Sequence, residues 1–434
     1  MSRICLGLGQ SAHSLFLHDN RDAATTASVG HDYDSKYQSI KPWEDRHVLQ
    51  QYRYFSADSH FECPPDMWTH RVPEAYRERA PRRVKLPNGN DIIVEEGRPI
   101  TFRGTNQFAG KPLETFSPVG LDFDHAVGAG PPQQRLKEQD QDGIDAELLF
   151  ASEARNPAIP DKAAFLAIVQ GFNDYFIEEY CGVAPHRLVG VAVLPDIGVD
   201  EDIAEMRRCK EKGFKAVRLH TFPSGKSFPT PEDDRFWAAA LDLDMPLTIH
   251  TSFPRQYRGR DHFLMKYPTE PEGQERPVAF LERIARHGIF HCGAIEAVQL
   301  ILNGVFDRFP KLQIYWAENN IGWIPYFYQQ MDQAYKVNCS WAERLLGLKR
   351  LSRLPSEYLK EHAHWGFWDD PFGVDVRHRI GVDRIMWSTD FPHIVTRWPE
   401  SKNLVQEQFV GVPEQEQHAM LAGNAVKFFH LNGK

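Results

Sequence analysis

The feature that most constrains the fold is an alternation of short apolar runs with helical segments. The runs predict strands at residues 55–57, 144–150, 188–194, 216–220, 246–250, 312–317, 362–367 and 384–388. Helical patterns follow at 162–183, 200–212, 233–244, 277–288, 295–309, 323–337, 374–381, 401–410 and 413–431. Strands that are apolar throughout are typical of parallel sheets covered by helices on both faces. The alternation therefore predicts an α/β fold, a distorted (β/α)8 TIM barrel.

An open, doubly wound sheet is the main structural competitor. That fold predicts a glycine-rich phosphate loop after an early strand. Neither GxGxxG nor GxxxxGK[ST] occurs in the sequence. The barrel is therefore the preferred fold.

Two segments fall outside the alternation. Residues 1–53 are polar and irregular, and they predict an extended N-terminal arm that contacts a neighbouring subunit. Residues 79–135 are rich in Arg, Pro and Gly, and their Pro-Asn-Gly-Asn stretch predicts a hairpin. We interpret 79–135 as an insertion after the first strand, placed to form a lid or a dimer contact, within a barrel domain at 54–434.

Composition excludes several classes of protein. The chain has 434 residues, 42% hydrophobic and 25% charged, with a formal net charge of −9. This charge argues against nucleic acid or an anionic membrane as a partner. No apolar run approaches the roughly 20 residues that span a bilayer, and the N-terminus lacks the pattern of a signal peptide. The six cysteines are scattered without a CxxC motif, so we expect reduced thiols in a cytoplasmic protein.

Potential metal ligands follow four of the apolar runs. They are Asp58 and His60, His250, Glu318, and Asp390. A carboxylate at the end of a buried strand is costly unless a cation or hydrogen bonds receive it. The carboxyl ends of barrel strands meet at one mouth, where barrel enzymes have their active sites. The pattern therefore predicts a metal site assembled from distant parts of the chain.

Each of these residues also has a structural explanation. Asp58 could cap a turn beside a core histidine at position 60, and Glu318 could cap the following helix. Residues two apart on a strand face the same side, which favours joint ligation by Asp58 and His60. Glu62 lies two residues further on and could join the site or act as its acid or base. Asp390 could bind metal and also accept a proton from a bound water.

Three further histidines could bind a second metal or the substrate. His220 ends the strand before His250, and His393 lies three residues after Asp390. His291 precedes a predicted helix, and a structural role is the simpler explanation for it. No GxSxG motif is present, so a serine hydrolase lacks its best signature.

Several phrases of the sequence together resemble the amidohydrolase-related family, typified by aminocarboxymuconate semialdehyde decarboxylase. They are ADSHFECPPDMW, PLTIHTSF, RFPKLQIYWAENNIGWIPY, IMWSTDFPH and LAGNAVKFFHL, within residues 54–434. The resemblance implies a distorted barrel with a divalent metal at its mouth. It also implies that Asp58, His60, His250 and Asp390 hold the metal.

The sequence departs from the family pattern at two positions. Asp58 stands where the family more often has histidine or glutamate, and Glu318 replaces a histidine that decarboxylases use. The site becomes rich in carboxylates, which shifts metal preference towards manganese or iron, although we expect zinc first. One ion or two could bind, because some relatives of this kind resemble dinuclear iron or iron–manganese oxygenases.

The leading hypothesis is a metal-dependent hydrolase. A metal-bound water would attack a C–N, C–O or C–C bond of a small cyclic or carboxylated substrate. Asp390 or Glu318 would take the proton of that water. The alternatives are non-hydrolytic decarboxylation, dinuclear oxygenation, and a non-catalytic subunit that partners an active homologue. We expect a homo-oligomer, with a hetero-oligomer as the alternative.

Overall fold

The computed structural model describes residues 52–96, 98–101, 106–117, 120–151, 161–253 and 293–431. Most of the predicted arm, the predicted helix at 277–288 and His291 lie outside the described residues. Among the described helices, none is both long and apolar enough to cross a membrane.

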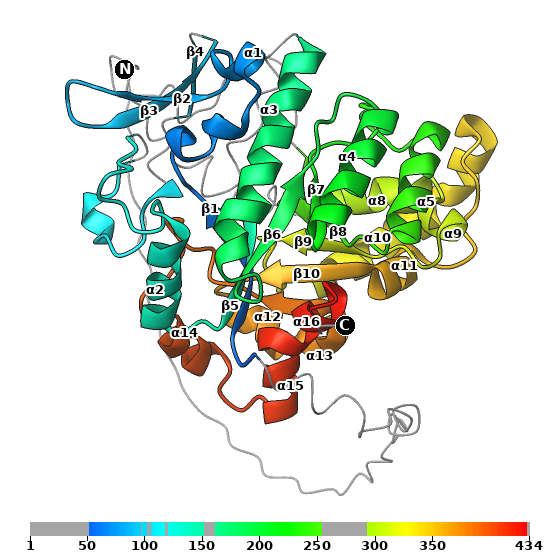
Figure 1. Ribbon diagram of the computed structural model, residues 1–434. Helices are drawn as coiled ribbons and strands as arrows, with labels where there is room; N and C mark the ends of the chain where they lie inside the picture. Colours follow the sequence, from blue (N-terminus) through cyan, green and yellow to red (C-terminus); the bar gives the residue numbers. More distant parts are fainter. Residues whose placement is uncertain are drawn as a thin grey trace, which may run out of the picture. The chain divides into compact units, whose positions relative to one another are not determined.

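Eight strands form one sheet in the order of the chain, which confirms the predicted barrel (Figure 1). They are β1 (Phe55–Phe61), β5 (Ala146–Ala151), β6 (Leu188–Val193), β7 (Ala216–Leu219), β8 (Leu247–His250), β9 (Ile314–Ala317), β10 (Ala363–Phe367) and β11 (Ile385–Trp387). Every neighbouring pair in this order is parallel. All eight carboxyl ends therefore point to the same mouth.

Hydrogen bonds join the first strand to the segment after the last one. The Asp390 amide donates to the Asp58 carbonyl over 3.0 Å, and the His60 amide donates to the Phe391 carbonyl over 2.7 Å. The Thr389 amide donates to the Ser56 hydroxyl over 2.9 Å. These contacts bring β1 and the β11 loop together at the mouth.

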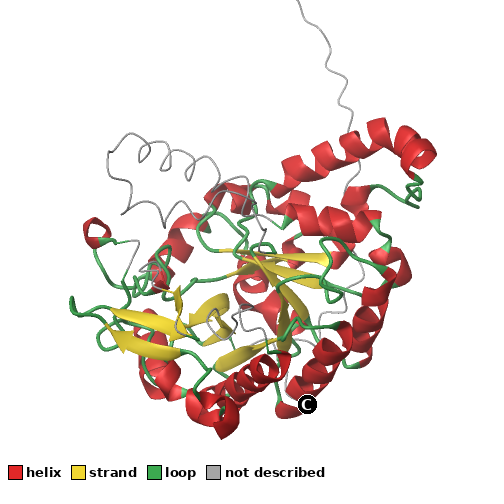
Figure 2. Cartoon of the chain, turned by 90° about the horizontal axis from the view of Figure 1, so that it is seen from above, coloured by secondary structure: helices red, strands yellow, loops and turns green. Residues whose placement is uncertain are grey.

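Helices surround the strands, as Figure 2 shows from above. The larger ones are α2 (Pro132–Asp142), α3 (Lys162–Tyr175), α4 (Val199–Lys212), α5 (Asp234–Asp242), α8 (Ala294–Leu302), α10 (Ile324–Leu346), α11 (Pro355–His362) and α14 (Ser401–Gln408). Shorter ones are α1 (Glu74–Arg77), α9 (Val305–Arg308), α12 (Pro371–Asp375), α13 (Arg377–Ile380), α15 (Glu414–His418) and α16 (Asn424–Phe428).

Alternate strand residues pack into two separate apolar clusters. On β5, Leu148 and Phe150 belong to a cluster that also contains Met386 of β11, whereas Leu149 packs in the larger cluster with residues of the helices. The first cluster fills the inside of the barrel and the second lies between sheet and helices. This alternation fixes which side chains face the mouth.

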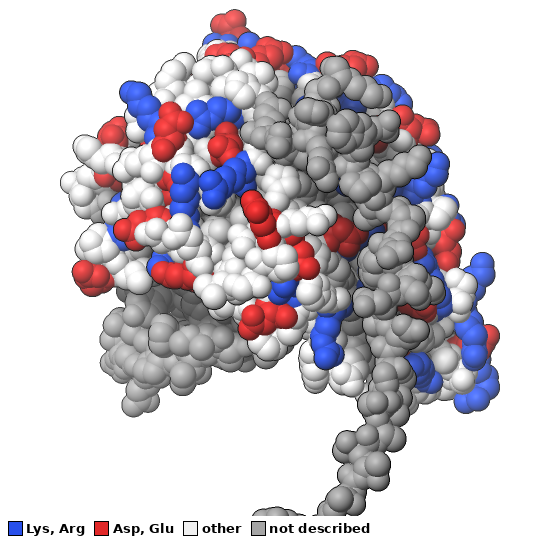
Figure 3. All heavy atoms as spheres, turned by 90° about the horizontal axis from the view of Figure 1, so that it is seen from below, with Lys and Arg blue, Asp and Glu red and all other residues white. Residues whose placement is uncertain are grey.

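The insertion carries its own antiparallel sheet of three strands, β2 (Arg82–Lys85), β3 (Asp91–Glu95) and β4 (Arg98–Thr101). The predicted hairpin is confirmed, because β2 and β3 pair around the Pro-Asn-Gly-Asn turn. Figure 3 shows acidic and basic side chains intermixed over the described part of the face seen from below.

Several predicted boundaries were wrong. The first strand extends to Phe61, so Asp58 and His60 lie within it and not after it. The helix predicted at 295–309 is two helices, α8 and α9, separated where Gly304 adopts a φ of 66°. The helix predicted at 323–337 continues to Leu346 in α10.

Candidate metal centre

The first strand supplies two potential ligands through an irregularity in its pairing. Ser56 pairs with Glu147 and Ser59 with Leu149, so β1 uses one residue more than β5 over this stretch. Such a bulge changes the face to which the following side chains point. Ala57 packs in the inner cluster, and Asp58 and His60 also point inward, fully buried at the mouth.

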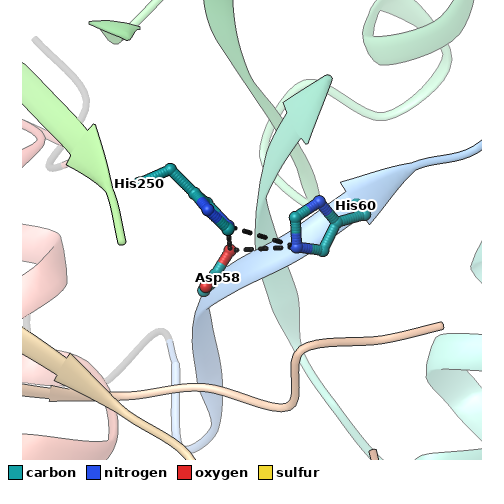
Figure 4. Close-up of side chains that lie close together, drawn as sticks. All are labelled: Asp58, His60 and His250. Atoms are coloured by element: carbon teal, nitrogen blue, oxygen red, sulfur yellow. Dashed lines mark hydrogen bonds and ion pairs between the residues drawn. The ribbon is translucent and has the colours of Figure 1, made fainter. Parts of the chain in front are cut away.

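His250 at the end of β8 meets these two side chains (Figure 4). Its Nε2 lies 3.2 Å from Asp58 Oδ1 and 3.3 Å from His60 Nε2. Leu247 and Ile249 pack outward, so the strand alternation directs His250 into the barrel. Asp58 and His60 come from β1, whereas His250 comes from β8, 190 or more residues away in sequence.

Asp390 approaches the same point from the segment after β11. Its Oδ1 lies 2.9 Å from His60 Nε2. The residue has a φ of 52°, in the left-handed region that L residues rarely adopt. Its backbone contact with Asp58 holds this conformation, and local backbone strain of this kind clusters at functional sites.

Glu318, directly after β9, also adopts a positive φ, of 53°. Its Oε2 lies 3.5 Å from His250 Nδ1, and 24% of its side chain is exposed. Carboxylate oxygens of Asp58, Glu318 and Asp390 lie within 4.8 Å of one another. Glu318 is therefore the partly exposed member of the cluster, facing the mouth.

His393 links Glu62 to the ligand cluster, which consists of Asp58, His60, His250, Glu318 and Asp390. Its Nδ1 lies 3.3 Å from Asp390 Oδ1 and its Nε2 3.1 Å from Glu62 Oε1. Its ring stacks on that of His60, with centroids 3.6 Å apart. Asn106 of the insertion donates to the same Glu62 oxygen over 3.2 Å. These contacts form a chain of polar groups from the insertion to the ligand cluster.

Burial and neighbouring charges separate the pKa values of the cluster. Burial raises the pKa of Asp58 to about 7 and lowers that of His60 to about 3. Burial, together with the charges of Asp390 and Asp58, raises the pKa of Glu318 well above its usual range. Burial also raises the pKa of Asp390. The charge of His393 and the hydrogen bonds that Asp390 accepts from His393 and His60 outweigh burial, so the net pKa is lower than usual.

The pKa of His393 shows the opposite balance. Burial lowers the pKa, but Asp390 and Glu62 outweigh burial and raise it well above the usual range. His250, with burial as the main cause, has a pKa well below its usual range. The cluster thus offers neutral imidazoles at His60 and His250 beside acidic oxygens, which are the forms in which these side chains bind metal.

The donors fit a divalent cation. Nitrogens of His60 and His250 and oxygens of Asp58 and Asp390 converge in overlapping groups of ligand atoms less than 4.8 Å apart. Asp58 Oδ2 is buried and makes no hydrogen bond with the residues that the structure describes. Burying a polar oxygen without a partner is costly, and a bound cation would remove that cost.

A buried arginine joins the two backbone segments that carry ligands. Arg135 of α2 pairs with Glu147 over 2.7 Å, with 1% and 3% of the two side chains exposed. Its guanidinium also donates to the His60 carbonyl over 3.0 Å and to the Phe391 carbonyl over 3.4 Å. Arg135 therefore holds β1 and the β11 loop in register.

The other predicted site residues are placed differently. His220 Nδ1 lies 3.6 Å from Asp196 Oδ2, and His220 belongs to none of the ligand groups found among the described residues. His291 lies outside the described residues. Arg135 was not among the predicted site residues, although it donates to the backbone carbonyl of His60.

Comparisons with known proteins identify the family of the chain. A family model described as amidohydrolase matches residues 65–431. A gamma-resorcylate decarboxylase from Rhizobium radiobacter is 27% identical over 322 residues, which cover 69% of this chain and 87% of that protein. A 2-amino-3-carboxymuconate-6-semialdehyde decarboxylase from Dictyostelium discoideum is 22% identical, covering 69% of this chain and 77% of its own.

Solved structures share the fold at low sequence identity. An amidohydrolase from Mycobacterium avium subsp. paratuberculosis K-10 has a TM-score of 0.65 and 17% identity, covering 87% of this chain and 99% of its own. A dihydroxybenzoic acid decarboxylase from Polaromonas sp. JS666, solved with bound manganese and the inhibitor 2-nitroresorcinol, has a TM-score of 0.53 and 22% identity, covering 71% and 88%. The predicted resemblance is thereby confirmed, and the chain is an enzyme that belongs to the amidohydrolase-related family.

Proposed function

We propose that the protein catalyses the metal-dependent, non-hydrolytic decarboxylation of a small carboxylated aromatic acid. Hydrolysis led the hypotheses drawn from the sequence, and decarboxylation was an alternative. Relatives named as decarboxylases support the alternative. The observation that carries the proposal is the position of the Glu318 carboxyl group, which faces the mouth with its Oε2 3.5 Å from His250 Nδ1 of the ligand cluster.

Asp58, His60, His250 and Asp390 would hold one divalent ion. Manganese is the first choice, because a relative's structure contains it and oxygen ligands suit it; zinc and iron are the alternatives. When bound, the ion would act as a Lewis acid that fixes and polarises the substrate's carboxylate. Arg135 would hold the His60 and Asp390 segments at the required separation.

Decarboxylation exchanges a carboxylate for a proton at one carbon. Glu318 would supply that proton, because burial and the charges of Asp390 and Asp58 raise its pKa and so favour the protonated form. The C–C bond to the carboxylate then breaks, carbon dioxide leaves, and the electron pair of that bond restores the aromaticity of the ring. Two groups whose pKa values are shifted in opposite directions can serve as the acid and the base of a site. Here the raised pKa of Glu318 suits it to donate a proton, whereas the lowered pKa of Asp390 keeps that carboxylate ionised.

Solvent would return the proton to Glu318 from the mouth. Glu62 and His393 would hold Asp390 ionised and in position through the contacts described above. The insertion contributes Asn106, whose hydrogen bond to Glu62 would connect the insertion to the site.

Isotope labelling tests the reaction type. The manganese-loaded enzyme is incubated with dihydroxybenzoates in deuterium oxide, and the products are analysed by mass spectrometry and NMR. The proposal predicts carbon dioxide and a phenol with one deuterium at the carbon that lost the carboxylate. Oxygen from labelled water in the organic product would establish hydrolysis instead, and consumption of dioxygen would establish oxygenation.

Substituting the acid tests its role. Glu318→Gln keeps the shape of the side chain but removes the proton donor. We expect turnover to fall about 100-fold or more, within the range for removal of a general acid, while metal content stays at one ion per chain. Unchanged turnover would rule out Glu318 as the donor.

A further inference from the structure

The turn after β11 is attached to the insertion as well as to the first strand. The His393 amide donates to the Asp390 carbonyl over 2.8 Å and closes a turn that contains Pro392. From the insertion, the amides of Phe108 and Ala109 both donate to the Pro392 carbonyl over 3.0 Å. The segment that carries the potential ligand Asp390 is therefore held from two sides.

A second part of the insertion packs against the ring of Pro392. Gly128 is buried and has a φ of 84°, in the left-handed region that favours glycine. A Cβ atom at this position would lie 2.6 Å from both Cβ and Cγ of Pro392 and 3.1 Å from Cε1 of Phe391. Contacts of 2.6 Å are shorter than those that Cβ atoms make in proteins. Both the backbone conformation and the contact with Pro392 therefore require glycine at position 128.

Neighbouring contacts hold Gly128 itself in place. Its amide donates to Glu138 Oε1 of α2 over 3.1 Å. The Glu138 carbonyl accepts a hydrogen bond from the indole of Trp398 over 3.0 Å. Trp398 in turn lies beside Phe391, with ring centroids 5.8 Å apart. The insertion, α2 and the turn are thus packed together, and a close-packed interior transmits the displacement of one residue to the next.

We propose that Gly128 is a positioning residue for the metal centre. The insertion seats Pro392 on Gly128, and this contact sets the place of Asp390, two residues earlier. Asp390 has a left-handed backbone conformation, with a φ of 52°, which persists only with support from the surrounding structure. The inference rests on the proposed metal centre, and it holds whichever reaction that centre catalyses.

A role in folding alone is the competing explanation. In that case a methyl group at position 128 would lower the free energy of unfolding and leave the affinity for manganese unchanged. A positioning role predicts weaker manganese binding by protein that is still folded. Gly89→Ala is the matched control, because Gly89 lies in the hairpin turn of the same insertion with a φ of 87°. A Cβ atom there would have nothing within 4 Å, so the two variants share the backbone cost and differ in the contact with Pro392.

Manganese titration of the full-length protein, followed by electron paramagnetic resonance of the free ion, separates the two roles. We expect Gly128→Ala to bind manganese about 10- to 100-fold more weakly, the range for loss of groups that orient ligands, and Gly89→Ala to stay within about twofold. Circular dichroism checks that both variants are folded. Pro392→Gly removes both atoms that the new methyl group would meet most closely. In that background Gly128→Ala should change the affinity less than about twofold, because the two substitutions act through one contact.

Hydrogen exchange tests the same coupling in the unaltered protein. If the contact stabilises the form that binds metal, manganese must stabilise the contact by the same free energy. Manganese should therefore slow the exchange of amides at 106–110 about 10-fold and leave the hairpin turn at 86–90 unchanged. This measurement does not depend on the folding of any variant.

Three results would overturn the proposal. They are equal manganese affinity of Gly128→Ala and the unaltered protein, an equal loss in Gly89→Ala, and unchanged exchange at 106–110. Each of these would leave the metal centre standing. Absence of manganese binding by the unaltered protein would overturn both the metal centre and the role of Gly128.

Discussion

The buried ion pair of Arg135 and Glu147 should affect both the free energy of unfolding and the affinity of the site for metal. Replacing Arg135 with methionine keeps an unbranched side chain of similar length but removes the charge. Glu147 would remain buried, and its remaining side-chain donors among the described residues are the Gln139 amide at 2.7 Å and the Ser59 hydroxyl at 3.1 Å. Removing one partner of a buried pair costs about 3–5 kcal/mol.

The second effect concerns metal binding. Arg135→Met removes the donors to two carbonyls, that of the ligand His60 and that of Phe391, which follows the ligand Asp390. Loss of groups that orient metal ligands weakens binding about 10- to 100-fold. The two effects separate in the double variant Arg135→Met/Glu147→Gln. It should regain about 1–3 kcal/mol, because no buried charge is left unpaired, but it should not regain metal affinity.

Urea unfolding of chelator-treated protein measures the first effect, and manganese titration measures the second. Arg235→Met is the control, because its ion pair with Asp200 is more than half exposed and is worth at most about 1 kcal/mol. If Arg135→Met loses no more stability than Arg235→Met, the buried pair does not support the fold. If the double variant regains metal affinity, Arg135 does not position the ligands.

Three further predictions concern the cluster. His250→Ala should lose metal and activity together, as measured by elemental analysis and turnover; full metal occupancy would refute its role as a ligand. Manganese affinity should fall as pH drops below about 7, because Asp58, with its pKa raised to about 7, takes up a proton that competes with the ion; Asp58→Asn should bind weakly at every pH. In the metal-free protein the raised pKa favours the protonated folded state, so the contribution of Asp58 to stability is present below pH 4 and is lost as pH rises towards 7. Melting temperatures across this range should show the loss, and its persistence in Asp58→Asn would assign it to another group.

The order of the strands and the residues at their ends are predictable from the sequence. Apolar runs buried on both faces have a clear pattern, and the carboxyl ends of parallel strands must meet. From these two facts alone, Asp58, His250 and Asp390 are expected to lie close together. The family resemblance then implies the metal.

Other features depend on contacts between distant residues. The bulge in β1, which points Asp58 and His60 inward, arises from pairing with β5 and has no local signature. The positive φ of Glu318 and Asp390 is likewise held by the surrounding fold. In the sequence, Arg135 is one more charged residue at the end of the insertion, because its partner Glu147 lies in an apolar strand. Long arginine side chains reach several strands, so strand periodicity alone does not reveal what they contact.

Comparison of turnover with and without metal tests the central claim most directly. Chelator-treated protein and protein reloaded with one equivalent of manganese are given the same panel of carboxylated aromatic acids, including dihydroxybenzoates, and released carbon dioxide is measured. The account predicts carbon dioxide from at least one acid, only after reloading, and with one ion per chain. Equal release by the chelator-treated protein would contradict it, and so would two bound ions with uptake of dioxygen.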